Sequence, residues 1–359
     1  MSLPRLASDQ ISQLDCAQLG RKLKEAFLKE PTGAAGVFSG KQVRRAEVEA
    51  LIGSQSIKDL TVLGIFETCP GDGLTSRFAV RHVLRKVLVT DHPKSRFRDE
   101  ALIVDPLWEG PALARMMPNR RRRLSLDLGT GCGILALVLA QWSDHVIASD
   151  INPRALAMGD LNARLNSVDN ISFVHSDLFE ALEGQRFDQI VFNAPVGTEF
   201  RPRHMLEAGE FILETFFKAM PHHLADNGVV QLNLCFRDWP NDSFVGRMRS
   251  WMGPTKPAFG SVLLRLWKRS SGLKFLFEKA LEAISAGPGA LSCEAVSRGI
   301  ITLMRSPVPT HTEIDVNYHQ WPPQPSIGHV GEAIVAAIET GHDHSLRNLL
   351  RSLEKTSST

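Results

Sequence analysis

Four short polar segments, each directly after an apolar run, carry the residue types that could do chemistry in this sequence. They are Leu-Gly-Thr-Gly-Cys-Gly at 128–133, Ser-Asp-Ile-Asn at 149–152, Ser-Asp-Leu-Phe at 176–179 and Asn-Ala-Pro-Val at 193–196. The apolar runs before them, at 124–128, 145–149, 171–175 and 187–192, read as strands. Because ligands bind beyond the carboxyl ends of the strands in a parallel α/β sheet, the four segments predict one pocket.

The first segment predicts a strand-to-helix turn that a ligand can approach closely. It holds Gly129, Gly131 and Gly133, and the apolar pattern from 134 to 142 predicts a helix. Glycines let the backbone come close to a ligand, and the free N–H groups of a helix start attract negative charge. A dinucleotide-binding turn of the form G-x-G-x-x-G would need glycine where Ile134 stands. An ordinary turn without a ligand is the alternative.

The next two segments each place a carboxylate at a strand end. Asp150 lies about twenty residues after the first glycine, where an acidic side chain can accept both hydroxyls of a ribose. Asp177 can accept the amino group of an adenine, and the backbone N–H beside it can reach a ring nitrogen. The alternatives are that Asp150 only caps the helix beginning at Pro153 and that Asp177 is a simple turn residue.

The fourth segment makes the pattern specific. With the glycine turn, Asp150 and Asp177, the segment Asn193-Ala194-Pro195-Val196 resembles the class I methyltransferases that depend on S-adenosylmethionine (SAM). It is most similar to N-methyltransferases with an Asn-Pro-Pro-aromatic motif, such as the release-factor glutamine methyltransferases and the small-domain rRNA guanine methyltransferases. The resemblance covers about residues 103–269. It implies a Rossmann-like α/β core with a mostly parallel seven-stranded sheet, and SAM as the cofactor.

The resemblance also implies a role for each segment. Methyl transfer is an in-line displacement at a sulfonium carbon, which requires the acceptor atom to be held in line. The side-chain oxygen of Asn193 and the carbonyl of Ala194, followed by Pro195, would orient an acceptor nitrogen, and no metal is implied. The implied cofactor-binding residues are Asp127, Gly129, Thr130, Gly131, Gly133, Asp150, Ile151, Asp177, Leu178 and Asn193.

The sequence departs from the motif at two positions. Ala194 replaces the first proline, which keeps the carbonyl but predicts a less rigid loop. Val196 replaces the aromatic residue that would stack on a planar acceptor; Trp108, Phe200 and Phe236 are candidates to supply such a face.

Three other functions compete with N-methylation. Methylation of a small-molecule hydroxyl or amine would tolerate Val196, and an O-methyl transfer would call on a general base such as His204, His222 or His223. A methyltransferase fold used only to bind a partner is the alternative of another class. A nicotinamide dehydrogenase is disfavoured by Ile134 and by the segment at 193–195. The acceptor itself stays open among a protein side chain, RNA and a metabolite.

Composition indicates an ordinary globular protein. The 359 residues are 43% apolar and 22% charged, and the net charge of +2 does not point to a nucleic-acid partner. No apolar run is long enough to span a membrane, and residues 1–5 begin no signal peptide. The five scattered cysteines lack metal or redox spacing. We expect a cytoplasmic protein, with a homodimer as one option.

Residues 1–100 predict an N-terminal accessory domain that serves as a lid or recognises the substrate. Helical patterns at 11–29, 42–52 and 56–66 precede a strand at 77–90, which suggests a winged-helix-like domain. Such domains often bind nucleic acid; a lid or a dimerisation element is the favoured alternative. The basic run 120–123 fits a solvated surface better than a phosphate contact.

Residues 101–284 are expected to form the core and 285–359 a C-terminal α+β appendage. In the core, Glu109 is a candidate for one side of the cofactor pocket, and the loop 199–204 for acceptor recognition. The appendage should contain a hinge at 285–289, a strand at 294–304, a proline-rich loop at 307–325, helices at 331–340 and 345–353 and a disordered tail from 355. The sequence His342-Asp343-His344 is a poor metal motif.

Overall fold

A computed structural model describes residues 6–92, 109–195, 203–238, 241–254, 258–266, 295–306, 309–316 and 328–355. The chain divides into two compact units, of which the first holds Met1–Pro111 and Leu126–Ala181. The second holds Ala112–Ser125 and Leu182–Thr359. Helix α5 (Glu109–Arg115), strand β6 (Arg122–Leu128) and the short helix η2 (Glu180–Leu182) cross the boundary.

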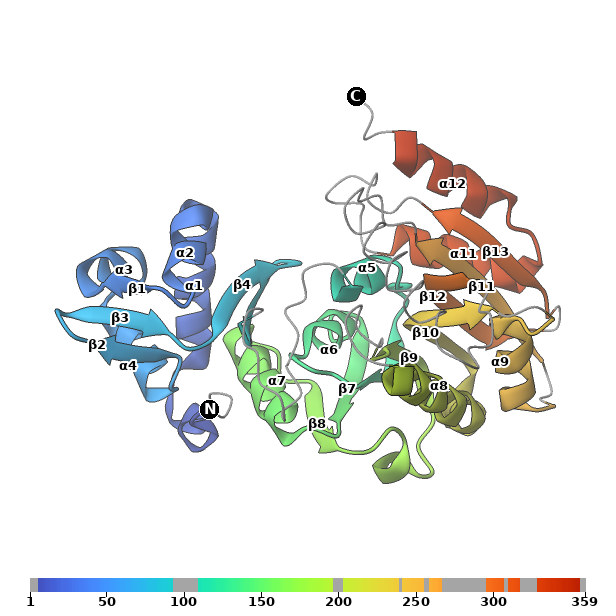
Figure 1. Ribbon diagram of the computed structural model, residues 1–359, viewed down its shortest axis with the longest axis horizontal. Helices are drawn as coiled ribbons and strands as arrows, with labels where there is room; N and C mark the ends of the chain where they lie inside the picture. Colours follow the sequence, from blue (N-terminus) through green and yellow to red (C-terminus); the bar gives the residue numbers. More distant parts are fainter. Residues whose placement is uncertain are drawn as a thin grey trace. The chain divides into compact units, whose positions relative to one another are not determined.

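The N-terminal part of the first unit is a small helical domain with a three-stranded sheet. Strands β1, β3 and β2 lie in that order and pair antiparallel, and helices α1, α3 and α4 contact one another (Figure 1). Helices that pack beside a small antiparallel sheet are compatible with the winged-helix-like prediction, which stays a prediction. Its elements are η1 (Ser8–Gln13), α1 (Cys16–Lys29), α2 (Pro31–Val37), β1 (Gln42–Arg44), α3 (Arg45–Ile52), α4 (Ser54–Val62), β2 (Phe66–Cys69) and β3 (Gly73–Ser76).

Several local predictions for this domain are wrong in detail. The helix expected at 42–52 begins only at Arg45, after β1, and the helix expected at 56–66 spans Ser54–Val62. The helix expected at 11–29 is interrupted, because the Asp15 side chain accepts a hydrogen bond from the Gln18 N–H and starts α1 anew. The strand expected at 77–90 is a hairpin of β4 (Ala79–Val83) and β5 (Lys86–Thr90). Leu84 and Arg85 both have positive φ, which is the backbone of a tight two-residue hairpin turn.

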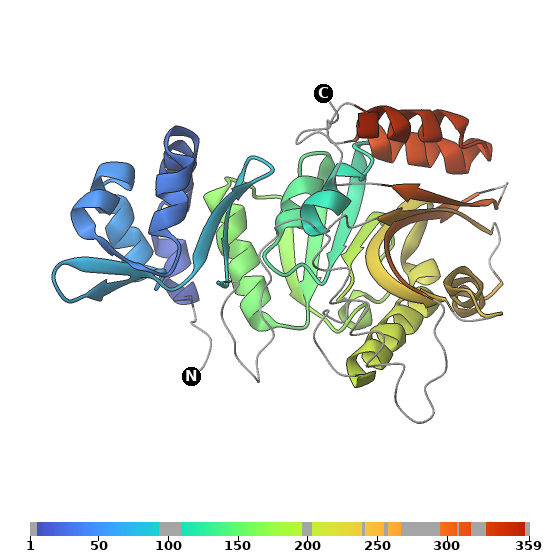
Figure 2. The ribbon, with the colours of Figure 1, turned by 45° about the horizontal axis from the view of Figure 1, so that its top comes forward.

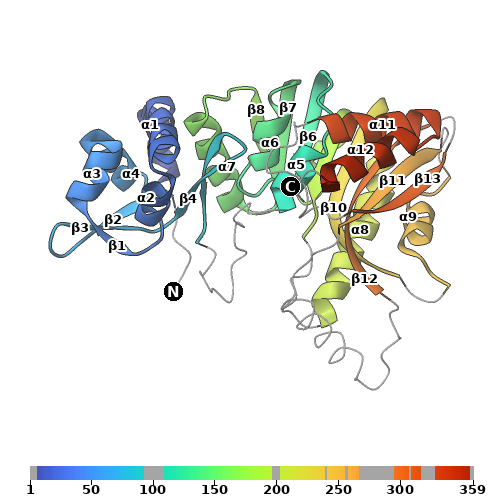
Figure 3. The same ribbon diagram turned by 90° about the horizontal axis from the view of Figure 1, so that it is seen from above.

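The rest of the first unit is a β/α segment in the order expected from the polar motifs. Strands β6, β7 (Ser143–Asp150) and β8 (Ile171–His175) are neighbours, and β7 and β8 pair in parallel. Helices α6 (Ile134–Leu139) and α7 (Pro153–Leu165) connect them. Figure 3 shows α7 with the N-terminal elements on one side and β7 and β8 on the other; α7 contacts α1, β5, β7 and β8.

The second unit is a curved sheet with helices on both faces. Its strands follow the order β13-β11-β12-β10-β9-β6. Helices α11 and α12 lie on one face of this sheet, and α8 and α9 lie on the other (Figure 2). The elements are β9 (Phe187–Asn193), α8 (Arg203–His223), β10 (Leu224–Asp238), α9 (Phe244–Met252), β11 (Phe259–Leu266), β12 (Ala295–Arg305), β13 (His311–Val316), α11 (His329–Thr340) and α12 (His344–Lys355).

Counting from β13 to β8, the α/β sheet has eight strands rather than the expected seven, because the C-terminal segment joins it. Strand β12 lies between β10 and β11 and pairs antiparallel with both, and its apolar residues Ile300, Ile301 and Leu303 are buried. Strand β11 therefore has a neighbour on both sides, β12 and β13. Residues 311–316, expected as loop, alternate Ile314 and Val316 inward and form the edge strand β13. The predicted hinge lies outside the described residues.

Candidate active site

The glycine turn has a backbone that only glycine adopts readily. Gly129, Gly131 and Gly133 have φ values of 64°, 55° and 80°. A Cβ atom on Gly133 would lie 3.3 Å from Cα of Gly159 in α7, so close packing also excludes a side chain there. The Thr130 N–H donates to the Ser149 carbonyl at 2.9 Å, which fixes the turn against the end of β7.

Asp127, at the end of β6, is a buried carboxylate in which only one of the two oxygens accepts hydrogen bonds from the described residues. Its Oδ2 accepts hydrogen bonds from Thr130 Oγ1 at 2.7 Å and from the Ala136 N–H at 2.9 Å. Its Oδ1 is buried and has no hydrogen-bond partner among the described residues. Burial raises the pKa of Asp127 to about 7, although its two hydrogen bonds act in the opposite direction. The free oxygen suits a hydrogen-bond donor, above all a cationic one.

Asp150 braces the glycine turn instead of capping a helix. Its Oδ2 accepts from the Gly131 N–H and its Oδ1 from the Asn152 N–H, each at 2.9 Å. The N-cap of α7 is Asn152, whose side chain accepts from the Arg154 N–H. The capping alternative for Asp150 is therefore wrong, and each of its oxygens keeps acceptor capacity for a ligand.

The ends of β7 and β8 present apolar and acidic groups side by side. Asp150 pairs with His175 in the parallel register, and His175 Nε2 lies 3.0 Å from the Ile151 carbonyl. The Ile151 side chain is 59% exposed, which is unusual for isoleucine. Leu178 has a φ of 44°, and the exposed Asp177 carboxylate has no hydrogen bond within the described ranges.

In the second unit, Asn193 is held by a second asparagine. Asn193 ends β9 opposite Asn233 of β10, and Asn233 Nδ2 donates to Asn193 Oδ1 at 2.7 Å. Asn233 is 1% exposed, and its Oδ1 has no partner in the described part of the chain. The Ala194 N–H donates to the Asn233 carbonyl at 3.0 Å, a bond that a proline at 194 could not make. Alanine at position 194 therefore lacks the rigidity of the proline in the motif, but it adds a backbone hydrogen bond to β10.

Several residues that the sequence suggested for the acceptor site lie away from Asn193 and Asn233 or outside the described residues. Pro195 is exposed, whereas Val196, Phe200, Trp108 and the His204 side chain lie outside the described residues. His222 and His223 precede β10, next to Phe187 at the amino end of β9, whereas Asn193 is at its carboxyl end. Neither of these two histidines is therefore placed as a base for a group at Asn193. Burial also lowers the pKa of His223.

The remaining motifs are structural. Arg120 of the basic run pairs with Glu332 and Glu339 of α11, at 2.7 and 2.9 Å. Asp343 pairs with Arg347 in α12. No group of three metal-binding side chains occurs in the described residues. Those residues also include no helix with the length and apolarity that a membrane crossing requires.

Sequence reasoning missed Asn233, which holds Asn193. The signal was a polar residue within the apolar run Val229–Cys235, which forms the middle of a buried strand. A second buried amide in that run, Gln231, donates to the Met116 carbonyl at 2.7 Å. Which of the two faces Asn193 depends on the register between β9 and β10.

The chain is similar to known methyltransferases. Residues 110–235 match the methyltransferase small domain. The chain is 31% identical over 145 residues to a Methanocaldococcus jannaschii protein assigned as an N5-glutamine methyltransferase, covering 36% of this chain and 71% of that protein. It is 33% identical over 122 residues to the ribosomal protein uL3 glutamine methyltransferase of Xanthomonas campestris, covering 30% of this chain and 40% of that protein. It is also 37% identical over 123 residues to the release factor glutamine methyltransferase of Escherichia coli, covering 34% of this chain and 42% of that protein.

Among solved structures, a methyltransferase from Pyrococcus furiosus matches with 14% identity and a TM-score of 0.38, covering 58% of this chain and 87% of that one. The fold and the glycine turn are those of a Rossmann-like methyltransferase. The chain belongs to the SAM-dependent methyltransferases with a small methyltransferase domain. It spans about two fifths of the length of the two bacterial glutamine methyltransferases.

Proposed function

We propose that this chain transfers a methyl group from SAM to the side-chain nitrogen of a glutamine in a protein acceptor. The observation that carries the proposal is the carboxamide of Asn193, fixed by Asn233 at the carboxyl end of β9. The relatives named above as glutamine methyltransferases support the acceptor class. A cytoplasmic location and a homodimer remain predictions.

The residues of the first unit fit SAM as the donor. SAM supplies an electrophilic methyl group on a sulfonium and carries an ammonium group at its amino-acid end. The unpaired Oδ1 of Asp127 suits that ammonium, and the positive-φ glycines leave the backbone open to a close approach. Asp150 would accept the ribose hydroxyls. The exposed Ile151, Asp177 and the backbone at Leu178 would hold the adenine.

On the acceptor side, Asn193 and Ala194 would orient the nitrogen. A carboxamide oxygen accepts two hydrogen bonds, and Asn233 uses one acceptor position of Asn193 Oδ1. The other position, with the Ala194 carbonyl, would accept the two N–H groups of an amide. Fixing both N–H groups positions the nitrogen for in-line attack. Pro195 would limit the conformations of the loop that follows.

Calorimetric titration with SAM tests the donor half of this proposal. We expect wild type to bind SAM and Asp150→Ala to lose binding, because the variant lacks a ribose acceptor and the brace on Gly131. Asp144→Ala is the matched control, since Asp144 is exposed near the opposite end of β7 and should not affect SAM affinity. A wild-type protein that binds no SAM would leave the partner-binding alternative in its place.

Transfer from radiolabelled SAM to synthetic glutamine peptides tests the acceptor half. Asn193→Ala should keep the SAM affinity of wild type but lose transfer by about a hundredfold or more, because it removes an interaction with the acceptor. Peptides with glutamate in place of glutamine are the control. Equal labelling of both peptide sets, or labelling of RNA or a metabolite pool alone, would refute the glutamine assignment.

A further inference from the structure

One asparagine in α7 connects the N-terminal domain to the glycine turn. Asn162 is fully buried. Its Nδ2 donates to the Cys132 carbonyl at 2.8 Å and to the Val89 carbonyl at 3.0 Å. Its Oδ1 accepts from the Val89 N–H at 2.7 Å. Both N–H bonds of the amide and its oxygen are therefore used, and Cys132 is the residue between Gly131 and Gly133.

The bonds to Val89 replace a missing strand neighbour. Strand β5 pairs with β4 on one edge only. On its other edge, Val89 bonds to Asn162, and Val87 bonds in the same way to Asn166, one helical turn further on. Residues i and i+4 of a helix lie on one face, so two asparagines match alternate residues of a strand. They satisfy backbone groups that would otherwise be buried without partners.

Of the two asparagines, only Asn162 also bonds to the glycine turn. Asn166 Nδ2 donates to Val87 and to the Asn162 carbonyl, which lie in the hairpin and in α7. A second tie lies at the start of α7, where Arg154 pairs with Asp91 just after β5, at 2.8 Å. Asp91 is 2% exposed, so this ion pair is largely shielded from water. These contacts hold the hairpin against α7. Asn162 also bonds to the Cys132 carbonyl, so the same side chain contacts both the hairpin and the glycine turn.

We propose that Asn162, which also holds Val89 of the β4–β5 hairpin, is a positioning residue for the glycine turn and thereby sets the affinity for the amino-acid end of SAM. The inference rests on the proposed function, in which the turn and Asp127 hold that end. With Asn162 replaced, the Cys132 carbonyl loses its donor, and the turn is free to leave the conformation in which Thr130 and Gly131 are held.

Ligands that differ at one end separate this role from a general loss of structure. The probes are SAM, S-adenosylhomocysteine and 5′-methylthioadenosine, which keeps the nucleoside but lacks the amino-acid end. For Asn162→Leu we expect SAM and S-adenosylhomocysteine to bind about tenfold or more weakly, because the Cys132 carbonyl in the turn loses the hydrogen bond from Asn162. Binding of 5′-methylthioadenosine should stay within about twofold of wild type. The measurement is calorimetric titration, with thermal unfolding of each variant recorded in parallel.

Asn166→Leu is the matched control, since it removes the same type of bonds to β5 without touching the turn. We expect it to lower the unfolding temperature to a degree similar to Asn162→Leu and to leave all three affinities unchanged. If Asn162→Leu does not fold, Asn162→Ser replaces it, because serine is too short to make both bonds.

Equal weakening of all three ligands, equal weakening in both variants, or wild-type affinity in a folded Asn162 variant would each overturn the inference. Wild-type protein that binds none of the ligands would instead overturn the proposed function.

Discussion

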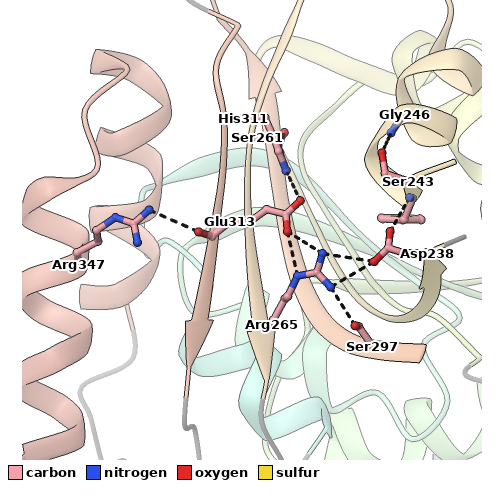
Figure 4. A network of polar contacts seen from close by, with 10 residues as sticks. Asp238, Ser243, Gly246, Ser261, Arg265, Ser297, His311, Glu313 and Arg347 are labelled. Atoms are coloured by element: carbon pink, nitrogen blue, oxygen red, sulfur yellow. Dashed lines mark hydrogen bonds and ion pairs between the residues drawn. The ribbon is translucent and has the colours of Figure 1, made fainter. Parts of the chain in front are cut away.

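Asp127 in the first unit and Glu313 in the second are carboxylates whose pKa values move in opposite directions. Burial raises the pKa of Asp127 to about 7, and one of its oxygens has no partner among the described residues. Hydrogen bonds from His311 and Arg265 hold the pKa of Glu313 at about 2. Figure 4 shows Arg265 between Glu313 and Asp238, with Ser297 on the same guanidinium. Glu313 is stabilised as an anion, and Asp127 is not.

This difference separates a structural network from a carboxylate that we propose to hold the ammonium group of SAM. The Glu313 network joins β10, β11 and β13, and both of its carboxylates pair with the guanidinium of Arg265. Asp127 lies beside a turn with three positive-φ glycines and has spare acceptor capacity. A buried polar group without a partner calls for an explanation, and a role in binding or catalysis is one of them. Asn233 Oδ1 in the second unit has the same character.

Asp127→Asn is the strongest test of the comparison. A raised pKa in the folded state stabilises the fold below the unfolded pKa of about 3.8, and this contribution is lost as the pH rises through about 7. The free energy of unfolding of wild type should therefore fall relative to the variant by about 3 kcal/mol between pH 5 and pH 8. Urea unfolding at both pH values measures it.

Saturating SAM should reduce this pH dependence in wild type, because a cationic group beside Asp127 favours its ionised form. If the free energy of unfolding without SAM depends on pH equally in wild type and Asp127→Asn, burial does not raise the pKa of Asp127. The contrast with Glu313 would then fail.

Gly133→Val tests the turn beside Asp127. The variant combines a β-branched residue at a φ of 80° with a Cβ 3.3 Å from Gly159, so both strain and crowding act on the turn. We expect a loss of about 2 kcal/mol of stability and SAM binding weaker by at least about tenfold. Urea unfolding and calorimetric titration measure the two effects.

Gly71→Val is the control for backbone strain. Gly71 has a similar φ of 74° in the β2–β3 turn, and no atom lies within 4 Å of the Cβ position. It should lose stability without losing SAM affinity. Equal affinity losses in the two variants would mean that the turn is no more sensitive than any other glycine of this unit.

The strands and their polar ends could be predicted from sequence because that information is local. The turn glycines directly follow the apolar run 124–128, and Asp150 directly follows the apolar run 145–149. The roles of Asn162 and Asn233 could not, because each depends on which backbone or side chain lies opposite it. The same holds for β12, whose place between β10 and β11 is set by packing of the whole sheet. A continuous strand pattern at 77–90 hid the hairpin, because Leu84 and Arg85 are not usual turn residues.

Glu313→Gln is the mildest test and addresses the other side of the comparison. A lowered pKa in the folded state stabilises the fold above the unfolded pKa of about 4.5, and this contribution is lost as the pH falls through about 2. Because the Glu313 side chain is 37% exposed, solvent screening limits the expected loss at pH 7 to less than about 1 kcal/mol. The free energies of unfolding of the variant and wild type should differ less near pH 2.5 than at pH 7. Glu25→Gln, which removes an exposed ion pair with Lys22, is the control and should hardly change the free energy of unfolding at pH 7. If Glu313→Gln loses as much stability near pH 2.5 as at pH 7, its neighbours do not stabilise the anion, and the two carboxylates differ only in burial.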